Sequence, residues 1–277
     1  MAMNLIIGKE WLLKNLHESH VRVVDCSFSL ANPEKGNQEY EHNHIPGACY
    51  FDLEKDLSGE VADHGGRHPL PNIEEFIHKL QQAGIDENTT VVSYDQGEGA
   101  FAARFWWLLQ YLGHEKVYVL DGGFKGWCEG NYPVTSDVPT FKKTTFIPVI
   151  KHDLLASMEE VRAVADEQNS NTFLLDSREE KRFLGLEEPI DKKAGRIPGA
   201  MNKPWFEGLN AGYYKPVEIQ KYRFSEINLD NKIIVYCGSG VTAAPNFLAL
   251  KAAGFEKVKL YLGSFSDWIS YQENKIE

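Results

Sequence analysis

The chain has 277 residues, which corresponds to one large globular unit or two ordinary ones and excludes a single small module. Hydrophobic residues make up 43% of the sequence and charged residues 25%, a balance that supports a sizeable buried core and excludes a disordered chain. With 29 basic and 40 acidic side chains, the net charge is −11. Such a charge repels nucleic acid and anionic membrane surfaces, so we expect neither as a partner.

The cysteines and the hydropathy pattern predict a cytoplasmic protein with free thiols. The four cysteines form no C-x-x-C pair, and they are too few for a disulfide framework in a chain of this length. The N-terminus has no basic region ahead of an apolar one, and no later segment approaches the ~18 uncharged apolar residues of a membrane span.

Two long parts of the chain resemble each other. The segment GHEKVYVLDGGFKGW at 113–127 and the segment GFEKVKLYLGSFSDW at 254–268 share seven of fifteen residues. His-Ile-Pro-Gly-Ala at 44–48 likewise matches Arg-Ile-Pro-Gly-Ala at 196–200. A spacing of 141 to 152 residues is too long for a solenoid repeat, so we infer a duplicated domain. We place the boundary near residue 142, which gives domains 1–142 and 143–277.

Short β-branched runs alternate with helical stretches in both halves. In chain order, Asn72 and Ser157 each stand three residues before a glutamate and predict helix starts, while residues 146–150 look strand-like. Runs at 171–176, 232–236 and 258–262 are apolar enough to be strands buried on both faces. This alternation predicts an α/β fold, with each half a mainly parallel sheet flanked by helices.

The segment most indicative of chemistry follows the predicted strand at 232–236. It reads Cys237-Gly-Ser-Gly-Val-Thr242 and leads into a helix predicted from about Thr242 to Gly254. Glycines let such a loop curl so that its N–H groups point inward, and the helix dipole adds positive potential. The predicted cradle consists of Gly238, Ser239, Gly240, Val241 and Thr242.

A thiolate would be stabilised in this cradle, so Cys237 is predicted to be a nucleophile. The alternative is an inert cysteine buried at a strand end. The sequence neighbours of Cys237 through Phe247 are all uncharged, so we expect the backbone dipoles to activate it. The other cysteines, for which the inert alternative is favoured, are Cys26, Cys49 and Cys128.

In combination these motifs resemble the two-domain rhodanese family, the thiosulfate and 3-mercaptopyruvate sulfurtransferases. The resemblance rests on the two I-P-G-A motifs, the Leu-Asp-Gly-Gly-Phe element with its Trp, and the C-G-S-G-V-T loop, and it covers nearly the whole chain. One domain of that family has lost the reactive cysteine, and Asp95 aligns here with Cys237. The resemblance therefore implies a non-catalytic first domain and a catalytic second domain.

The resemblance also implies the reaction. Cys237 takes sulfur from a donor as a persulfide and passes it to a thiol, to cyanide or to an acceptor protein, with no cofactor and no metal. Arg182 matches the family's donor-anchoring arginine, although its alternative is a surface ion pair with Glu179 or Glu180. Ser239 matches a catalytic loop serine that assists 3-mercaptopyruvate chemistry.

The resemblance bears on His68 and Glu54, and a third residue, Arg178, is assigned a structural role. His68 matches a first-domain histidine that faces the substrate cleft, and Glu54 occupies the place of its acidic partner. Arg178 is expected to be structural and to pair with Asp176.

The loop composition bears on the donor. Thiosulfate-preferring members carry Arg and Lys after the cysteine, whereas Gly238 and Ser239 are neutral, which favours 3-mercaptopyruvate. The second arginine of the family's carboxylate clamp has no match, because the aligned stretch presents Ile190. The candidates to replace it are Lys192, Lys193 and Arg67.

Three other functions fit parts of the sequence less well. Cysteine phosphatases also place a cysteine in a curled loop, but that loop ends in an arginine, and no arginine follows Cys237 here. A non-catalytic interaction module of the same fold usually lacks the cysteine or its loop. Zinc binding by His42 and His44, or by His64 and His68, lacks a third ligand at metal spacing.

Overall fold

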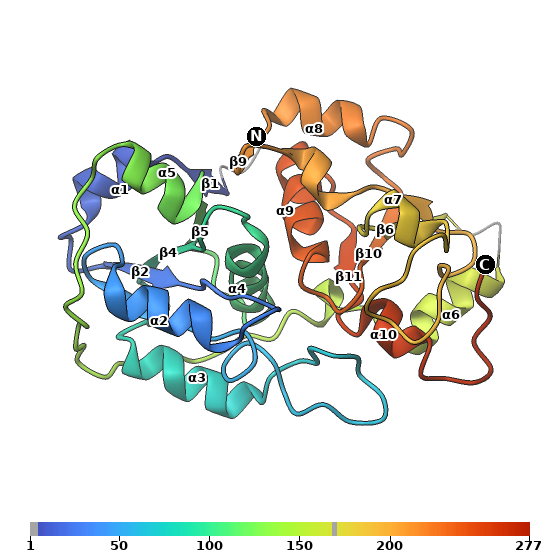
Figure 1. The fold of residues 1–277 in the computed structure, drawn as a ribbon, viewed down its shortest axis with the longest axis horizontal. Helices are drawn as coiled ribbons and strands as arrows, with labels where there is room; N and C mark the ends of the chain where they lie inside the picture. The colour runs from blue at the N-terminus through green and yellow to red at the C-terminus, as the bar shows by residue number, and fades with distance from the viewer. Residues whose placement is uncertain (1–4, 168–170) are drawn as a thin grey trace.

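The two similar parts of the chain fold into two α/β halves that lie side by side (Figure 1). The computed structural model describes residues 5–167 and 171–277. The first half runs from blue to green in Figure 1 and the second from yellow to red. The predicted class, parallel sheets flanked by helices, is confirmed.

The first half is built on a five-stranded sheet in which all neighbouring strands are parallel, in the order β1-β5-β4-β2-β3. Its strands are β1 (Ile6–Ile7), β2 (Val21–Asp25), β3 (Ala48–Tyr50), β4 (Thr90–Tyr94) and β5 (Val117–Leu120). Its helices are α1 (Lys9–Asn15), α2 (Glu34–His42), α3 (Ile73–Gln82), α4 (Ala100–Tyr111) and α5 (Gly123–Glu129).

The second half repeats this plan with a four-stranded parallel sheet in the order β11-β10-β6-β7. Its parallel strands are β6 (Thr172–Asp176), β7 (Met201–Asn202), β10 (Lys232–Tyr236) and β11 (Val258–Leu260). A separate antiparallel pair consists of β8 (Leu209–Asn210) and β9 (Tyr213–Tyr214). The α-helices are α6 (Met158–Asp166), α7 (Glu180–Phe183), α8 (Val217–Arg223), α9 (Ala243–Ala253) and α10 (Ser264–Trp268), and two 3₁₀-helices cover His152–Leu154 and Trp205–Gly208.

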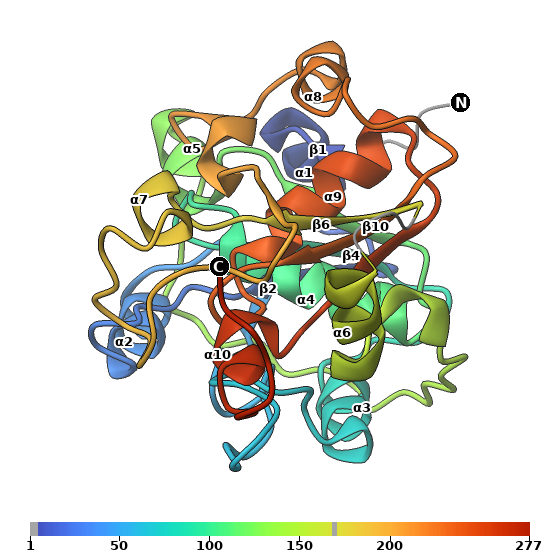
Figure 2. The ribbon, with the colours of Figure 1, turned by 90° about the vertical axis from the view of Figure 1, so that its right-hand side faces the viewer.

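Helices cover both faces of the second sheet, with α8 and α9 on one side and α6 and α10 on the other (Figure 2). Alternate residues of a strand point to opposite faces, and β10 follows this rule. Ile233 and Val235 belong to the apolar cluster that contains α9, whereas Ile234 and Tyr236 belong to the cluster of α6 and α10. Burial on both faces explains why β10 carries no charged residue after Lys232.

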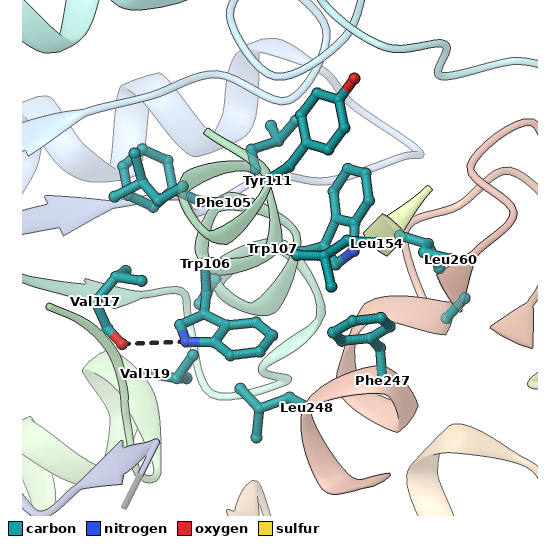
Figure 3. Close-up of a cluster of buried hydrophobic side chains, with 14 of the residues drawn as sticks. Phe105, Trp106, Trp107, Tyr111, Val117, Val119, Leu154, Phe247, Leu248 and Leu260 are labelled. Atoms are coloured by element: carbon teal, nitrogen blue, oxygen red, sulfur yellow. Dashed lines mark hydrogen bonds between the residues drawn. The ribbon is translucent and has the colours of Figure 1, made fainter. Parts of the chain in front are cut away.

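The halves meet through helices α4 and α9. Figure 3 shows Trp106 and Trp107 of α4 beside Phe247 and Leu248 of α9, and the rings of Trp106 and Phe247 have centroids 6.1 Å apart. One cluster of buried apolar side chains extends across both halves. A helix with few polar residues is expected to be buried on most sides, and eleven of the twelve residues of α4 are buried.

Each half also sends a loop over the other. Residues 58–71 of the first half, here called the first strap, dock on α10: Gly65 N–H donates to Asp267 Oδ1 at 2.7 Å, and the ring of His64 stacks on Tyr271 at 4.0 Å. Residues 203–216 of the second half form the second strap, whose Tyr214 N–H donates to Asp121 at 2.8 Å. Each half thus supplies a strap that contacts the other half.

Most local expectations are confirmed. The side chains of Asn72 and Ser157 cap α3 and α6, and the helix expected from about Thr242 to Gly254 is α9. Residues 146–150 are not a strand: they run extended along the first half, where Val149 N–H donates to Leu112 O at 2.9 Å. The division near residue 142 stays a prediction. Among residues 5–167 and 171–277, no helix combines the length and apolarity needed to cross a lipid bilayer.

Candidate active site

Cys237 lies directly after β10, where the chain turns toward α9. It is 1% exposed, and its Sγ accepts a hydrogen bond from Gly240 N–H at 3.1 Å. Ser264 Oγ accepts the N–H of Cys237 at 3.1 Å and lies 3.9 Å from Sγ. The sulfur therefore has two polar neighbours, one from its own loop and one from the start of α10.

The loop from Cys237 to Thr242 curls, as expected from its glycines. The carbonyls of Cys237 and Gly238 are held away from the sulfur, because they accept hydrogen bonds from Phe265 N–H at 3.0 Å and Ser266 N–H at 2.9 Å. Gly240 has a φ of 76°, and a Cβ there would overlap the carbonyl oxygen of Leu262. Only glycine fits this position, and its conformation directs an N–H group at the sulfur.

The first half contains the same cradle with its centre filled. Asp95 follows β4 as Cys237 follows β10, and counting back from Gly113 and Gly254 places Gly99 opposite Gly240, both with a φ of 76°. Asp95 Oδ1 accepts the N–H groups of Gly97 and Gly99 at 3.0 and 2.8 Å. Its Oδ2 accepts those of Phe101 and Ala102 at 3.1 and 3.2 Å. A buried carboxylate thus occupies this anion cradle.

Two arginines lie over the cysteine loop at Gly238. A Cβ at Gly238 would be 2.9 Å from Nη2 of Arg67 and 3.4 Å from Nη2 of Arg182. Arg67 comes from the first strap and Arg182 from α7, so each half contributes one guanidinium group. By contrast, Lys192 and Lys193 are exposed. Of the three candidates to replace the missing arginine, Arg67 is the one that the structure places beside this loop and Arg182.

Buried carboxylates hold these arginines. Asp191 binds both Arg67 and Arg182, with its Oδ2 2.8 Å from Arg182 Nη2, and Glu188 binds Arg182 at 2.8 to 3.1 Å. Burial acts to raise the pKa of Glu188, but the hydrogen bonds and charge of Arg182, together with the backbone N–H groups of Asp191 and Ile190, hold that pKa below its usual value. Burial raises the pKa of Asp191, against the effect of Arg67. Arg182 is thus not the surface ion pair given as its alternative, although Glu179 lies 4.0 Å away.

Arg178 extends the same network and is structural, as expected. Its side chain is 1% exposed and binds Asp176 through Nε and Nη2 at 3.0 and 2.6 Å. It also contacts Glu188 at 3.3 Å. The result is one row of alternating charges, which runs Asp176, Arg178, Glu188, Arg182, Asp191, Arg67.

His68 reaches the loop, and Glu54 does not. His68 Nδ1 lies 2.9 Å from Ser239 Oγ, and both residues are buried. Burial, reinforced by Arg104 and Arg67, lowers the pKa of His68 to about 3, so the ring is neutral at pH 7. No hydrogen bond joins Glu54 to His68 within the described parts of the chain. Asp52 Oδ1 accepts the N–H of Glu54 at 2.9 Å in a tight turn that leaves the Glu54 side chain exposed.

Sequence reasoning missed Arg104, which approaches the loop from behind. This residue of α4 is fully buried, and its Nη1 donates to Gly240 O at 3.2 Å. The sequence neighbours of Cys237 are uncharged, but three guanidinium groups reach the loop region from other segments. The charge around the loop could therefore not be predicted from those neighbours. A signal was present: Arg104 is the one charged residue among the mostly apolar residues 100–111.

The other cysteines and the histidine pairs have different surroundings. Burial raises the pKa of Cys49 to about 12 and also raises the pKa of Cys26, which disfavours their thiolates, and Cys128 is exposed. His44 stacks on Tyr40 at 4.1 Å. Within the described residues, no group of three or more His, Cys, Asp or Glu side chains is placed to hold a metal ion.

The chain is similar to known proteins over nearly its whole length. The family model of the rhodanese-like domain matches residues 8–130 and again 157–271. The chain is 40% identical over 276 residues to a probable 3-mercaptopyruvate sulfurtransferase of Pseudomonas aeruginosa, covering 98% of this chain and 96% of that protein. It is 32% identical to the thiosulfate sulfurtransferase of Gallus gallus, over 95% of this chain and 92% of that one.

A solved structure extends the agreement to the fold. The crystal structure of a 3-mercaptopyruvate sulfotransferase from Escherichia coli superposes with a TM-score of 0.84 at 30% identity, covering 95% of this chain and all of that one. The duplicated parallel sheets and the two matched segments lead to one assignment: the chain belongs to the rhodanese family and carries two rhodanese-like domains in tandem.

Proposed function

We propose that this sulfurtransferase carries the transferred sulfur on Cys237. The thiolate attacks the donor sulfur and forms an S–S bond, while the bond from that sulfur to the rest of the donor breaks and leaves its electron pair on the leaving group. With 3-mercaptopyruvate a C–S bond breaks, the thiol proton ends on the released carbon and pyruvate leaves. With thiosulfate, sulfite leaves. The Cys237 persulfide then gives its outer sulfur to an acceptor and returns to the thiolate.

The contacts of Asp95 carry this proposal. The outer sulfur of a persulfide is two bonds from Cβ, as are the carboxylate oxygens of aspartate. In the first half those oxygens accept four backbone N–H groups. Counting back from Gly113 and Gly254, Thr242 and Ala243 correspond to Phe101 and Ala102, whose N–H groups bind Asp95 Oδ2. We therefore assign Gly240 to the inner sulfur, and Thr242 and Ala243 to the outer one.

Arg182 and Arg67 are proposed to hold the anionic end of the donor. A guanidinium group presents a planar fork that matches a carboxylate or sulfonate, and two such groups converge at Gly238. Asp191 keeps them together before a donor binds. The Arg67 side chain is 33% exposed, so solvent and donor reach it.

We propose 3-mercaptopyruvate as the preferred donor, with measurable activity toward thiosulfate. Gly238 and Ser239 add no charge of their own beside the cysteine, as expected for a monoanionic donor. With the proton of the neutral His68 ring on Nδ1, the ring donates to Ser239 Oγ and leaves the Ser239 hydroxyl proton for the donor oxygen that gains negative charge as the C–S bond breaks.

The test is to incubate the protein with each donor in the absence of an acceptor and to measure its mass. We expect the addition of one sulfur atom, located on Cys237 by peptide mapping. Cys237→Ser should abolish the addition, whereas the matched control Cys128→Ser, at an exposed cysteine, should retain it. Sulfur on another cysteine, or none on a folded protein with either donor, would refute the proposal. Comparative kcat/KM values for the two donors test the preference.

We further propose that the protein works in the cytoplasm and serves small thiols, cyanide or an acceptor protein there. The four cysteines are free in the structure, as a reducing compartment would keep them. Cell fractionation tests the location. Transfer of labelled sulfur from the persulfidated protein to a thiol, measured against transfer to cyanide, ranks the acceptors.

A further inference from the structure

Arg104 is a buried cation that has no carboxylate partner among residues 5–167 and 171–277. It is 0% exposed, and its hydrogen bonds go to neutral oxygens. The acceptors are the carbonyls of Leu57, His68, Pro69 and Gly240 and the hydroxyl of Ser58, at 2.8 to 3.3 Å. No carboxylate of the described residues lies within 4.0 Å of its guanidinium group. A buried charge left without an opposite charge is costly, so a compensating anion is expected nearby.

The other guanidinium groups at the loop do not lack such partners. Asp191 offsets Arg67, and Glu188 and Asp191 offset Arg182. His68, the remaining titratable group that reaches the loop, is neutral because burial lowers its pKa to about 3. Arg104 therefore contributes a positive charge at this site that no carboxylate of the described residues pairs with.

Cys237 is the ionisable group that the structure links to Arg104, through Gly240. Burial lowers the pKa of Arg104 to about 10, which leaves the guanidinium protonated at pH 7, and a negative charge on Cys237 acts in the opposite direction. Arg104 also binds the carbonyl of Gly240, whose N–H donates to Cys237 Sγ. One side chain of the first half thus supplies a charge to the cysteine and fixes the residue that binds its sulfur.

We propose that Arg104 is a positioning residue of the non-catalytic half that serves as the buried counter-charge of the Cys237 anion. The proposal rests on the role of Cys237 as the reacting residue. Arg104 belongs to α4, which lies at the contact between the halves. The ionisation of Cys237 then depends on the docking of the first half on the second. A loop activated by its own dipoles alone would not show this dependence.

The experiment measures the rate of iodoacetamide modification of Cys237 as a function of pH in the full-length protein. Arg104→Met keeps much of the side-chain volume and removes the charge, so the midpoint of the pH profile should rise by about one pH unit. Arg104→Lys retains the charge and should restore at least half of that shift. The control is Arg223→Met, which removes a guanidinium group that also binds neutral oxygens but lies on α8.

A folded Arg104→Met protein with an unchanged midpoint would overturn the proposal, as would an equal shift in Arg223→Met. If Arg104→Met does not fold, a comparison of wild type with Cys237→Ala decides. The quantity to measure is the difference in the free energy of unfolding between the wild type and Cys237→Ala. If the Cys237 thiolate compensates Arg104, this difference should grow in favour of the wild type as the pH rises from 5.5 toward 8.5, where a free thiol ionises. A constant difference would overturn the proposal. Alkylation needs no donor, so the pH profile reports on the ionisation of Cys237 even in a protein that forms no persulfide, and failure of the proposed function is distinguished from failure of this inference.

Discussion

The hydroxyl of Ser239 in the second half lies 2.9 Å from the imidazole of His68 in the first half. The first strap brings His68 there, and Asp267 and Ser266 of the second half hold that strap through its backbone N–H groups. The side chains around the reactive loop therefore come from both halves, although only the second half contains the cysteine. The first half thus takes part in building the loop region of the second, although Asp95 stands in it where the second half has Cys237.

The buried imidazole predicts how stability depends on pH. Because the pKa of His68 falls from 6.5 to about 3 on folding, the unfolded chain binds a proton between those values that the folded chain does not. Stability should thus fall as the pH drops below 6.5. The contribution of His68 is up to about 1.4 kcal/mol per pH unit.

Urea denaturation at pH 7 and pH 5 checks this contribution. His68→Gln should lose less stability over that interval than the wild type does. His64→Gln, which removes an exposed histidine from the same strap, is the control. An equal loss of stability in the wild type and in His68→Gln would contradict the prediction.

Asp95 should matter for stability and not for turnover. Asp95→Asn places an amide NH₂ where the carboxylate accepts N–H groups, and an unsatisfied buried polar group costs ~1–3 kcal/mol. We expect turnover within a few-fold of the wild type and a lower free energy of unfolding. Steady-state kinetics and denaturant titration measure the two effects. A folded variant as inactive as Cys237→Ser would mean that the first half carries the chemistry.

The contrast between Cys237 and Arg104 shows how far the sequence predicts this site. Strand, cysteine, glycines and helix are contiguous, so local propensity is enough to predict the cradle and the start of α9. Arg104 reaches the loop only because α4 packs on α9, and Arg67 only because the first strap crosses to α10. These contacts depend on tertiary packing, which one sequence does not reveal. Glu54 was expected beside His68, but the backbone turn closed by Asp52 directs it to solvent.

The two loop arginines should control the affinity for the donor. Arg182→Lys keeps the charge but loses the fork, so the KM for the donor should rise about tenfold, equivalent to ~1.4 kcal/mol, while the KM for the acceptor changes little. Arg67→Lys should act in the same direction. Arg162→Lys, which alters a distant ion pair with Glu273, is the control for a general effect of the substitution. Unchanged KM values for both donors in Arg182→Lys would assign that residue a structural role only.

The last prediction separates the two properties of Gly240, its backbone conformation and its lack of a side chain. Gly240 and Gly199 have φ values of 76° and 74°, so alanine is strained by ~1–2 kcal/mol at both. A Cβ at Gly199 would meet nothing within 4 Å, whereas at Gly240 it would overlap the carbonyl oxygen of Leu262. Gly240→Ala must therefore displace the N–H group that binds Cys237 Sγ, and Gly199→Ala must not.

We expect Gly240→Ala to lower kcat at least tenfold and to slow the alkylation of Cys237 at pH 7, because the thiolate loses a donor. Gly199→Ala should lower the unfolding temperature slightly and leave both rates unchanged. Thermal unfolding shows whether each variant is folded before its rates are compared. Equal activity of the two variants would show that the close approach of Gly240 to Leu262 does not shape the cradle, and that the sulfur is stabilised by other groups.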